Sequence, residues 1–166
     1  MFIAPYDMDA PWDTRGVPGT YRFLNRVWNI VQEFIEVGSQ IPPASTVTSD
    51  ILKITHATIK KVTRDIEDEK FNTAVAAMME MVNALYKIKE ADGMAQSAEW
   101  TFALESLLQI LAPFAPHITE ELWAQTADLG AARGEGAAVP RHRAEPWPQL
   151  STLDARRAVP EREKHV

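Results

Sequence analysis

Apolar residues recur every three or four positions from residue 20 to residue 123, which is the spacing of amphipathic helices. The first such stretch covers residues 20–37, with Pro18 before it and Gly38 after it. Proline is tolerated in a first helical turn and glycine favours a helix end, so both residues suit the borders of a helix. A Ser- and Pro-rich linker over residues 39–46 separates it from a second helical stretch over residues 49–70.

Three further helices are expected in the middle of the chain. The third covers residues 73–90 with Asn72 as its N-cap, and the fourth covers residues 97–111 and is ended by Pro113. A short fifth helix, HITEELWAQ, begins after Pro116. No stretch has the two-residue alternation of a strand. The sequence therefore predicts an all-α bundle of four main helices plus a short fifth.

The two ends of the chain lack this periodicity. Residues 1–19 are rich in Pro, Asp and aromatics and are expected to be an irregular lead-in to a bundle over residues 20–150. Residues 151–166 are charged and are expected to be a mobile tail. Trp12 and Trp147 are expected to pin irregular segments to the bundle, whereas three tryptophans on apolar faces are expected to pack in it: Trp28, Trp100 and Trp123.

Composition limits the class of protein. The chain is 46% hydrophobic and 24% charged, as in ordinary soluble proteins, and it has no cysteine and no apolar run of membrane-spanning length. A cytoplasmic protein with no membrane partner is expected. The net charge of −6 is unevenly distributed, since residues 20–64 hold six Lys/Arg and three Asp/Glu, while residues 65–128 hold three and twelve. One part of the surface is therefore suited to a polyanion and another would repel it.

The chain has no recognisable catalytic or metal-binding motif. A nucleophile elbow and a phosphate-binding P-loop are both missing, and none of the four histidines has a Glu three residues before it. The segment HITEE begins at His117 but has Glu121 where a zinc-binding helix needs a second His. No catalytic residue, metal or cofactor is therefore predicted for this chain.

Two helix faces carry cations at helical spacing. On the second predicted helix these are Lys53, His56, Lys60 and Arg64, with Lys61 at the margin. On the first predicted helix, Arg22, Arg26 and Asn29 share a face opposite the apolar stripe. One interpretation is that both faces bind phosphates. The other is a solvated surface, which is what most charged stripes are.

Several segments resemble bacterial leucyl-tRNA synthetases, which are class I aminoacyl-tRNA synthetases. They are FLNRVWNIV (23–31), IKKVTRDIEDEKFNTAVAAMMEMVNALYK (59–87) and LESLLQILAPFAPHITEELW (104–123). The lead-in resembles the segment after that family's KMSKS loop, and PWP (146–148) resembles the end of its helical bundle. The pattern PFxPxxTEELW is shared with valyl- and isoleucyl-tRNA synthetases, which stay open as alternatives. Residues after 150 carry no family inference.

The resemblance implies an anticodon-binding-type helical domain that docks on the tRNA backbone and contacts the catalytic domain of the same parent chain. The parent would attach leucine to tRNA(Leu) using ATP, while this chain lacks the HIGH and KMSKS motifs and should be inactive alone. Asn25 and Arg26 match an Asn-Arg pair of the family, and Asn25, Trp12, Trp28 and Trp123 are expected to have structural or junction roles. The expected tRNA-binding residues are Arg22, Arg26, Lys53, His56, Lys60, Lys61 and Arg64. A structural or protein-interaction bundle with no RNA role is the other alternative.

Overall fold

Five α-helices make up the described part of the protein. The computed structural model describes residues 16–37 and 45–132. The helices are α1 (Gly16–Glu36), α2 (Ser45–Glu67), α3 (Phe71–Asp92), α4 (Ala98–Leu111) and α5 (Pro116–Ala132), and the described residues include no strand. The all-α bundle predicted from the sequence is confirmed.

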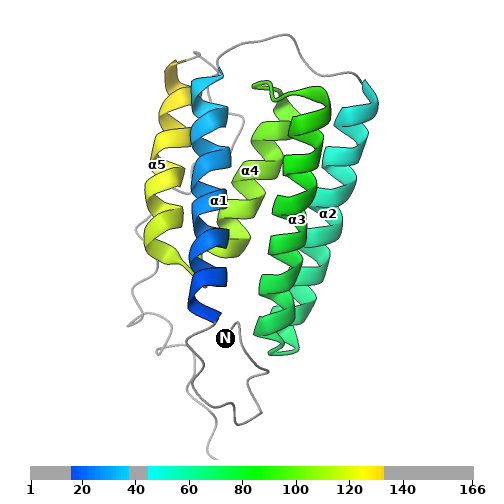
Figure 1. Cartoon of the computed structure of the whole chain (residues 1–166), viewed down its shortest axis with the longest axis vertical. Helices are drawn as coiled ribbons and strands as arrows, with labels where there is room; N and C mark the ends of the chain where they lie inside the picture. The colour runs from blue at the N-terminus through cyan, green and yellow to red at the C-terminus, as the bar shows by residue number, and fades with distance from the viewer. Residues whose placement is uncertain (1–15, 38–44, 133–166) are drawn as a thin grey trace, which may run out of the picture.

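Successive helices run in opposite directions along one long axis (Figure 1). α2 packs on both α3 and α4, whereas α1 packs on α5 and α3. α3 therefore lies between α1 and α2 on the viewed side, and α4 lies behind them (Figure 1). This order decides which charged helix faces are neighbours.

The core is built from one apolar stripe of each helix. A three- and four-residue spacing places these side chains on one face, and burying each large one contributes about 1.5–3 kcal/mol. Fully buried members come from all five helices: Val27, Ile30, Ile51, Met78, Met81, Leu85, Trp100, Leu104, Leu107, Leu108 and Leu122. Trp100 is buried as predicted, while Trp28 and Trp123 are partly buried and pack against the core.

α1 begins at Gly16 rather than at the predicted residue 20, so the last four residues of the expected lead-in are helical. Pro18 is compatible with this start because the N–H groups of a first turn have no partner within the helix. Thr20 supports the turn, because its Oγ1 donates to the carbonyl oxygen of Gly16 at 3.2 Å. Residues 1–15, including Trp12, lie outside the described residues.

The predicted N-cap of α3 is wrong. Asn72 lies inside the helix, and Lys70 occupies the N-cap position without a side-chain capping bond. The chain reverses just before it, where Glu69 has a positive φ of 58° and the Lys70 N–H donates to the Asp65 carbonyl oxygen at 2.6 Å. A tight backbone turn therefore sets the start of α3, in place of the side-chain cap suggested by the sequence.

The last two helices begin close to where the sequence predicts. Ser97 caps α4, because its side chain accepts a hydrogen bond from the Trp100 N–H at 3.4 Å. α5 begins at Pro116 as expected and continues to Ala132, beyond the predicted segment HITEELWAQ. Turn and cap residues are thus the least predictable parts of an otherwise predictable bundle.

Candidate nucleic-acid interface

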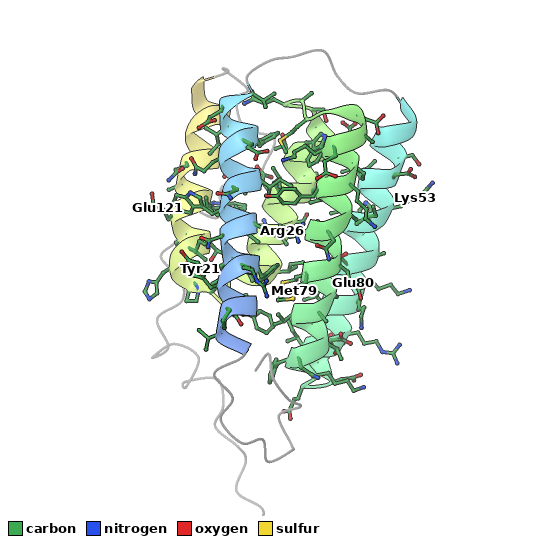
Figure 2. The ribbon with its side chains drawn as sticks, viewed as in Figure 1. Tyr21, Arg26, Lys53, Met79, Glu80 and Glu121 are labelled. Carbon is green, nitrogen blue, oxygen red and sulfur yellow. The ribbon has the colours of Figure 1, made fainter. Side chains whose placement is uncertain are left out.

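The cations predicted on the second helix share an exposed face of α2. Because Ile51, Thr55 and Val62 are buried on the inner side, positions between them in the helical register face solvent. Four exposed residues lie on this outer face and are called here the α2 row: Lys53, His56, Lys60 and Arg64. Figure 2 shows Lys53 pointing away from the bundle at the outer edge of α2.

Most basic residues on this part of α2 are paired with carboxylates. Lys53 Nζ lies 3.3 Å from Asp50 Oδ1, and Arg64 Nε lies 3.9 Å from Asp68 Oδ2. Lys60 has no ion pair within the described part of the chain. Ion pairs this exposed are worth little, so they hold the side chains only weakly.

Lys61 differs from the α2 row because its partner is nearly buried. Its Nζ donates to Asp65 Oδ2 at 2.9 Å, and the Asp65 side chain is only 10% exposed. Burial alone would raise the pKa of Asp65, but hydrogen bonds from Lys61 and Thr73 and the charges of Lys61 and Lys70 together lower it. Asp65 therefore links α2 to the start of α3, and Lys61 belongs partly to that structural contact.

His56 lies where α2 meets α4. Its ring centroid is 5.2 Å from that of Phe102, with the planes tilted by 44°. The residue remains exposed despite this contact. Phe102 thus positions the only α2-row side chain that has an aromatic ring.

Arg26 of α1 is engaged within the bundle. Its Nη1 donates to Asn83 Oδ1, its guanidinium carbon lies 4.5 Å from the centroid of the Tyr86 ring, and the Tyr86 hydroxyl donates to its carbonyl oxygen at 3.1 Å. Lys89 Nζ lies 4.4 Å from the same centroid and pairs with Glu33 at 2.6 Å. These contacts, named here the α1–α3 clasp, join the two helices, and Figure 2 shows Arg26 on the side of α1 that faces α3.

Arg22 is more accessible than Arg26. It is exposed, and its Nε donates to the Pro18 carbonyl oxygen at 3.3 Å, while its other guanidinium nitrogens make no hydrogen bond or ion pair within the described residues. Both arginines lie on α1, and α3 separates α1 from α2 (Figure 1). The outer face of α3 carries Glu80 and Lys87 there, both exposed. The structure therefore does not bring the cations of α1 and α2 together into one patch.

The expected junction residues fall on different surfaces. Asn25 is exposed on α1, whereas Trp28 and Trp123 pack against the core. The sequence interpretation missed two apolar residues on the same exposed side of α1, Val17 and Tyr21, which are 54% and 66% exposed. The sequence could have revealed both, because they are apolar residues that stand outside the apolar stripe of the helix. Together they form a small exposed apolar area one helical turn long.

The described residues offer few other kinds of site. Within residues 16–37 and 45–132, no three His, Asp or Glu side chains are grouped so that they could hold a metal ion. None of the described helices has the length and apolar content needed to cross a bilayer.

Comparison with known proteins defines the family. Residues 49–165 match the model of the anticodon-binding domain of tRNA ligases. Leucine–tRNA ligases are similar over most of the chain. The protein from Bdellovibrio bacteriovorus is 40% identical over 148 residues, which are 89% of this chain. Those from a Geobacter species and Dehalococcoides mccartyi are 43% and 46% identical, each over 75% of the chain.

The chain spans only 15–16% of the length of these relatives. A solved structure, the ternary complex of LeuRS with tRNA and LeuAMS from Agrobacterium radiobacter, matches with a TM-score of 0.66 and 30% identity. That match covers 92% of this chain and 19% of the larger one. The chain therefore belongs to the family of anticodon-binding domains of tRNA ligases, and the relatives it resembles are leucine–tRNA ligases.

Proposed function

We propose that this chain docks on the sugar-phosphate backbone of tRNA(Leu) as one domain of a leucine–tRNA ligase. The observation that carries the proposal is the α2 row, with Lys60 at its centre free of any ion pair within the described residues. Residues 53–64 span about 16 Å along a helix at a rise of 1.5 Å per residue, enough to follow several phosphates.

The chemistry of the α2 row favours backbone docking over base reading. Phosphate contacts fix position and orientation without reading sequence. Base stacking would need exposed aromatic rings in a basic groove, and the aromatic neighbour of the row, Phe102, is partly buried against His56. In this proposal Arg22 is a second cation that meets another part of the same RNA, while Arg26 of the same helix acts chiefly in the α1–α3 clasp.

The parent enzyme would attach leucine to tRNA(Leu) in the cytoplasm using ATP, with the chemistry performed outside this chain. The catalytic domain of the same polypeptide is then the natural protein partner. We assign the exposed side of α1 that carries Val17, Tyr21 and Asn25 to that contact, because it combines apolar and amide groups and lacks acids.

The test compares two variants with the same change in net charge. Replacing Lys60 and Arg64 with Gln removes two positive charges from the α2 row, and Lys87→Glu makes the same change on α3. Binding of a labelled tRNA(Leu) transcript to the 166-residue chain is measured by fluorescence anisotropy between about 20 and 200 mM salt. The double variant should bind about ten-fold more weakly, and its plot of log K against log salt should be shallower by about two.

Lys61 is left out of the test because Lys61→Glu would also break the buried contact with Asp65. A double variant that binds like the wild type, or no more weakly than Lys87→Glu, would reject the proposed surface. Absence of any tRNA binding at low salt would favour the structural bundle instead. Equal binding of leucine, valine and isoleucine tRNAs is expected if contacts are to the backbone alone.

A further inference from the structure

A carboxylate, Asp68, lies beside the last residue of the α2 row, where it contacts two basic side chains, Arg64 and Lys70. Asp68 Oδ2 lies 3.0 Å from Lys70 Nζ and 3.9 Å from Arg64 Nε. All three side chains are accessible, with Arg64 81% exposed and Asp68 41% exposed. Asp68 is therefore a counter-ion shared by Arg64 and Lys70 at the surface where α2 ends.

An incoming phosphate would compete with this carboxylate for the same cations. Exposed ion pairs are worth about 0–1 kcal/mol, so the competition weakens binding without preventing it. Asp68 also adds a negative charge within reach of the RNA, which reduces the local positive potential. Lys60, about one helical turn before Arg64, has no such competitor among the described residues.

Resting on the proposed function, we infer that Asp68 limits the affinity of the α2 row for RNA by competing with phosphate for Arg64 and Lys70. The carboxylate acts by holding Arg64 and Lys70, so it tunes the site without touching the phosphates. Its removal should free both cations and tighten binding.

Asp65 cannot have this role although it also pairs with a lysine. Its side chain is nearly buried and accepts hydrogen bonds from both α2 and α3, so its loss would disturb the turn between the helices. Glu67 supplies the matched control. It is exposed, belongs to the same acidic segment and makes no ion pair that the structure describes.

The experiment measures tRNA(Leu) binding to Asp68→Asn and Glu67→Gln, which raise the net charge equally. Asp68→Asn should bind about two- to five-fold more tightly than Glu67→Gln and steepen the salt dependence by about one. Asp50→Asn, which frees Lys53, should act in the same direction. The salt concentration at which each variant elutes from a heparin column gives a second measure of polyanion binding. Circular dichroism checks that each variant keeps its helices.

The outcomes separate the inference from the proposed function. Equal binding by Asp68→Asn and Glu67→Gln, while the Lys60/Arg64 double variant is weakened, would overturn the role of Asp68 and leave the docking surface in place. Unchanged binding by the double variant would remove the docking surface and this inference with it. Tighter binding by Asp68→Asn with an unchanged salt slope would show that no additional phosphate contact had formed, which also contradicts the counter-ion role.

Discussion

At the scale of single residues, Asp65 shows how a side chain acquires a role that its place in the sequence does not reveal. In the sequence it opens an acidic run, Asp65–Glu69, whose simplest role is to complement the dipole at the start of α3. In the fold it lies one helical turn after Lys61 and within reach of Thr73, which belongs to the next helix. Only the reversal between α2 and α3 brings Thr73 to Asp65.

Protonation of Asp65 is linked to the stability of the fold. Because the folded-state pKa of Asp65 is lowered below its ordinary value of 3.8, its ionised form stabilises the fold above pH 4, and this contribution is lost as the pH falls through the folded-state pKa. Asp65→Asn should therefore lower the free energy of unfolding at pH 7 by about 1–3 kcal/mol.

Urea unfolding followed by circular dichroism at pH 7 and at pH 3 measures this effect. The difference between wild type and Asp65→Asn should shrink at the lower pH, because the carboxyl of the unfolded chain is protonated there and the advantage of the lowered folded-state pKa decreases. Glu67→Gln, an exposed acid one turn or less away, should change little at either pH. A difference that is the same at both pH values would mean that the charge of Asp65 is not what stabilises the turn.

Trp100 marks a limit of prediction at the same scale. Its place on an apolar face predicts burial, and it is fully buried. Its indole N–H, however, has no hydrogen-bond partner in the described structure, which no pattern of hydrophobic positions would indicate. Periodicity reports which side of a helix is buried, whereas partners of individual polar atoms depend on how neighbouring helices are placed.

At the scale of the elements, the sequence predicts where the helices lie along the chain better than it predicts which helices contact one another. Five helical stretches were predicted from apolar spacing and five are present in the described residues. Cap residues were harder, because Ser97 is a side-chain cap whereas Asn72 is not, although both are favourable residue types. The backbone turn at Glu69 and Lys70 decides the second case, and such turns depend on the packing of both flanking helices.

The α1–α3 clasp is an element-scale contact that the sequence did not predict. Arg26 and Lys89 both lie against the ring of Tyr86, although 63 residues separate them in the chain. The sequence interpretation assigned Arg26 to phosphate binding, because a cation on the polar side of a helix has the same appearance in either role. Its contacts with Tyr86 and Asn83 give it a packing role as well.

Variants of Tyr86 separate the parts of the clasp. Tyr86→Phe keeps the ring and loses the hydrogen bond to the Arg26 carbonyl, which should cost about 0.5–1.5 kcal/mol of unfolding free energy. Tyr86→Leu also removes two cation–π contacts, worth about 0.5–1 kcal/mol each at accessible sites. Denaturant unfolding should therefore rank the proteins as wild type, then Tyr86→Phe, then Tyr86→Leu.

Arg26→Gln should resemble these variants, lowering stability by about 1 kcal/mol with little change in the salt dependence of tRNA binding. If Arg26→Gln instead kept its stability and bound tRNA with a shallower salt dependence, phosphate contact would be its main role. Equal stability of Tyr86→Phe and Tyr86→Leu would indicate that the ring contacts contribute nothing measurable.

At the scale of the whole molecule, the arrangement of the helices divides the positive charge into two groups. The net charge is −6 and residues 20–64 carry more cations than acids, but the sequence does not reveal that α3 stands between α1 and α2. This division follows from which helices contact one another: α2 packs on α3 and α4, while α1 packs on α5 and α3. Two separated groups could meet two parts of one large RNA, and one small anion could not bridge them.

Additivity of substitutions tests this division. Arg22→Gln on α1 and Lys60→Gln on α2 should each weaken tRNA(Leu) binding and each reduce the salt slope by about one. Because the two side chains lie on helices separated by α3, their effects on binding free energy should add within about 0.5 kcal/mol in the double variant.

Lys60→Gln combined with Arg64→Gln, on adjacent turns of one helix, is the matched case in which the effects need not add. Coupling between Arg22 and Lys60 as large as that between Lys60 and Arg64 would mean that both groups bind the same phosphates, which would require the RNA to wrap closely around α3 and its exposed Glu80.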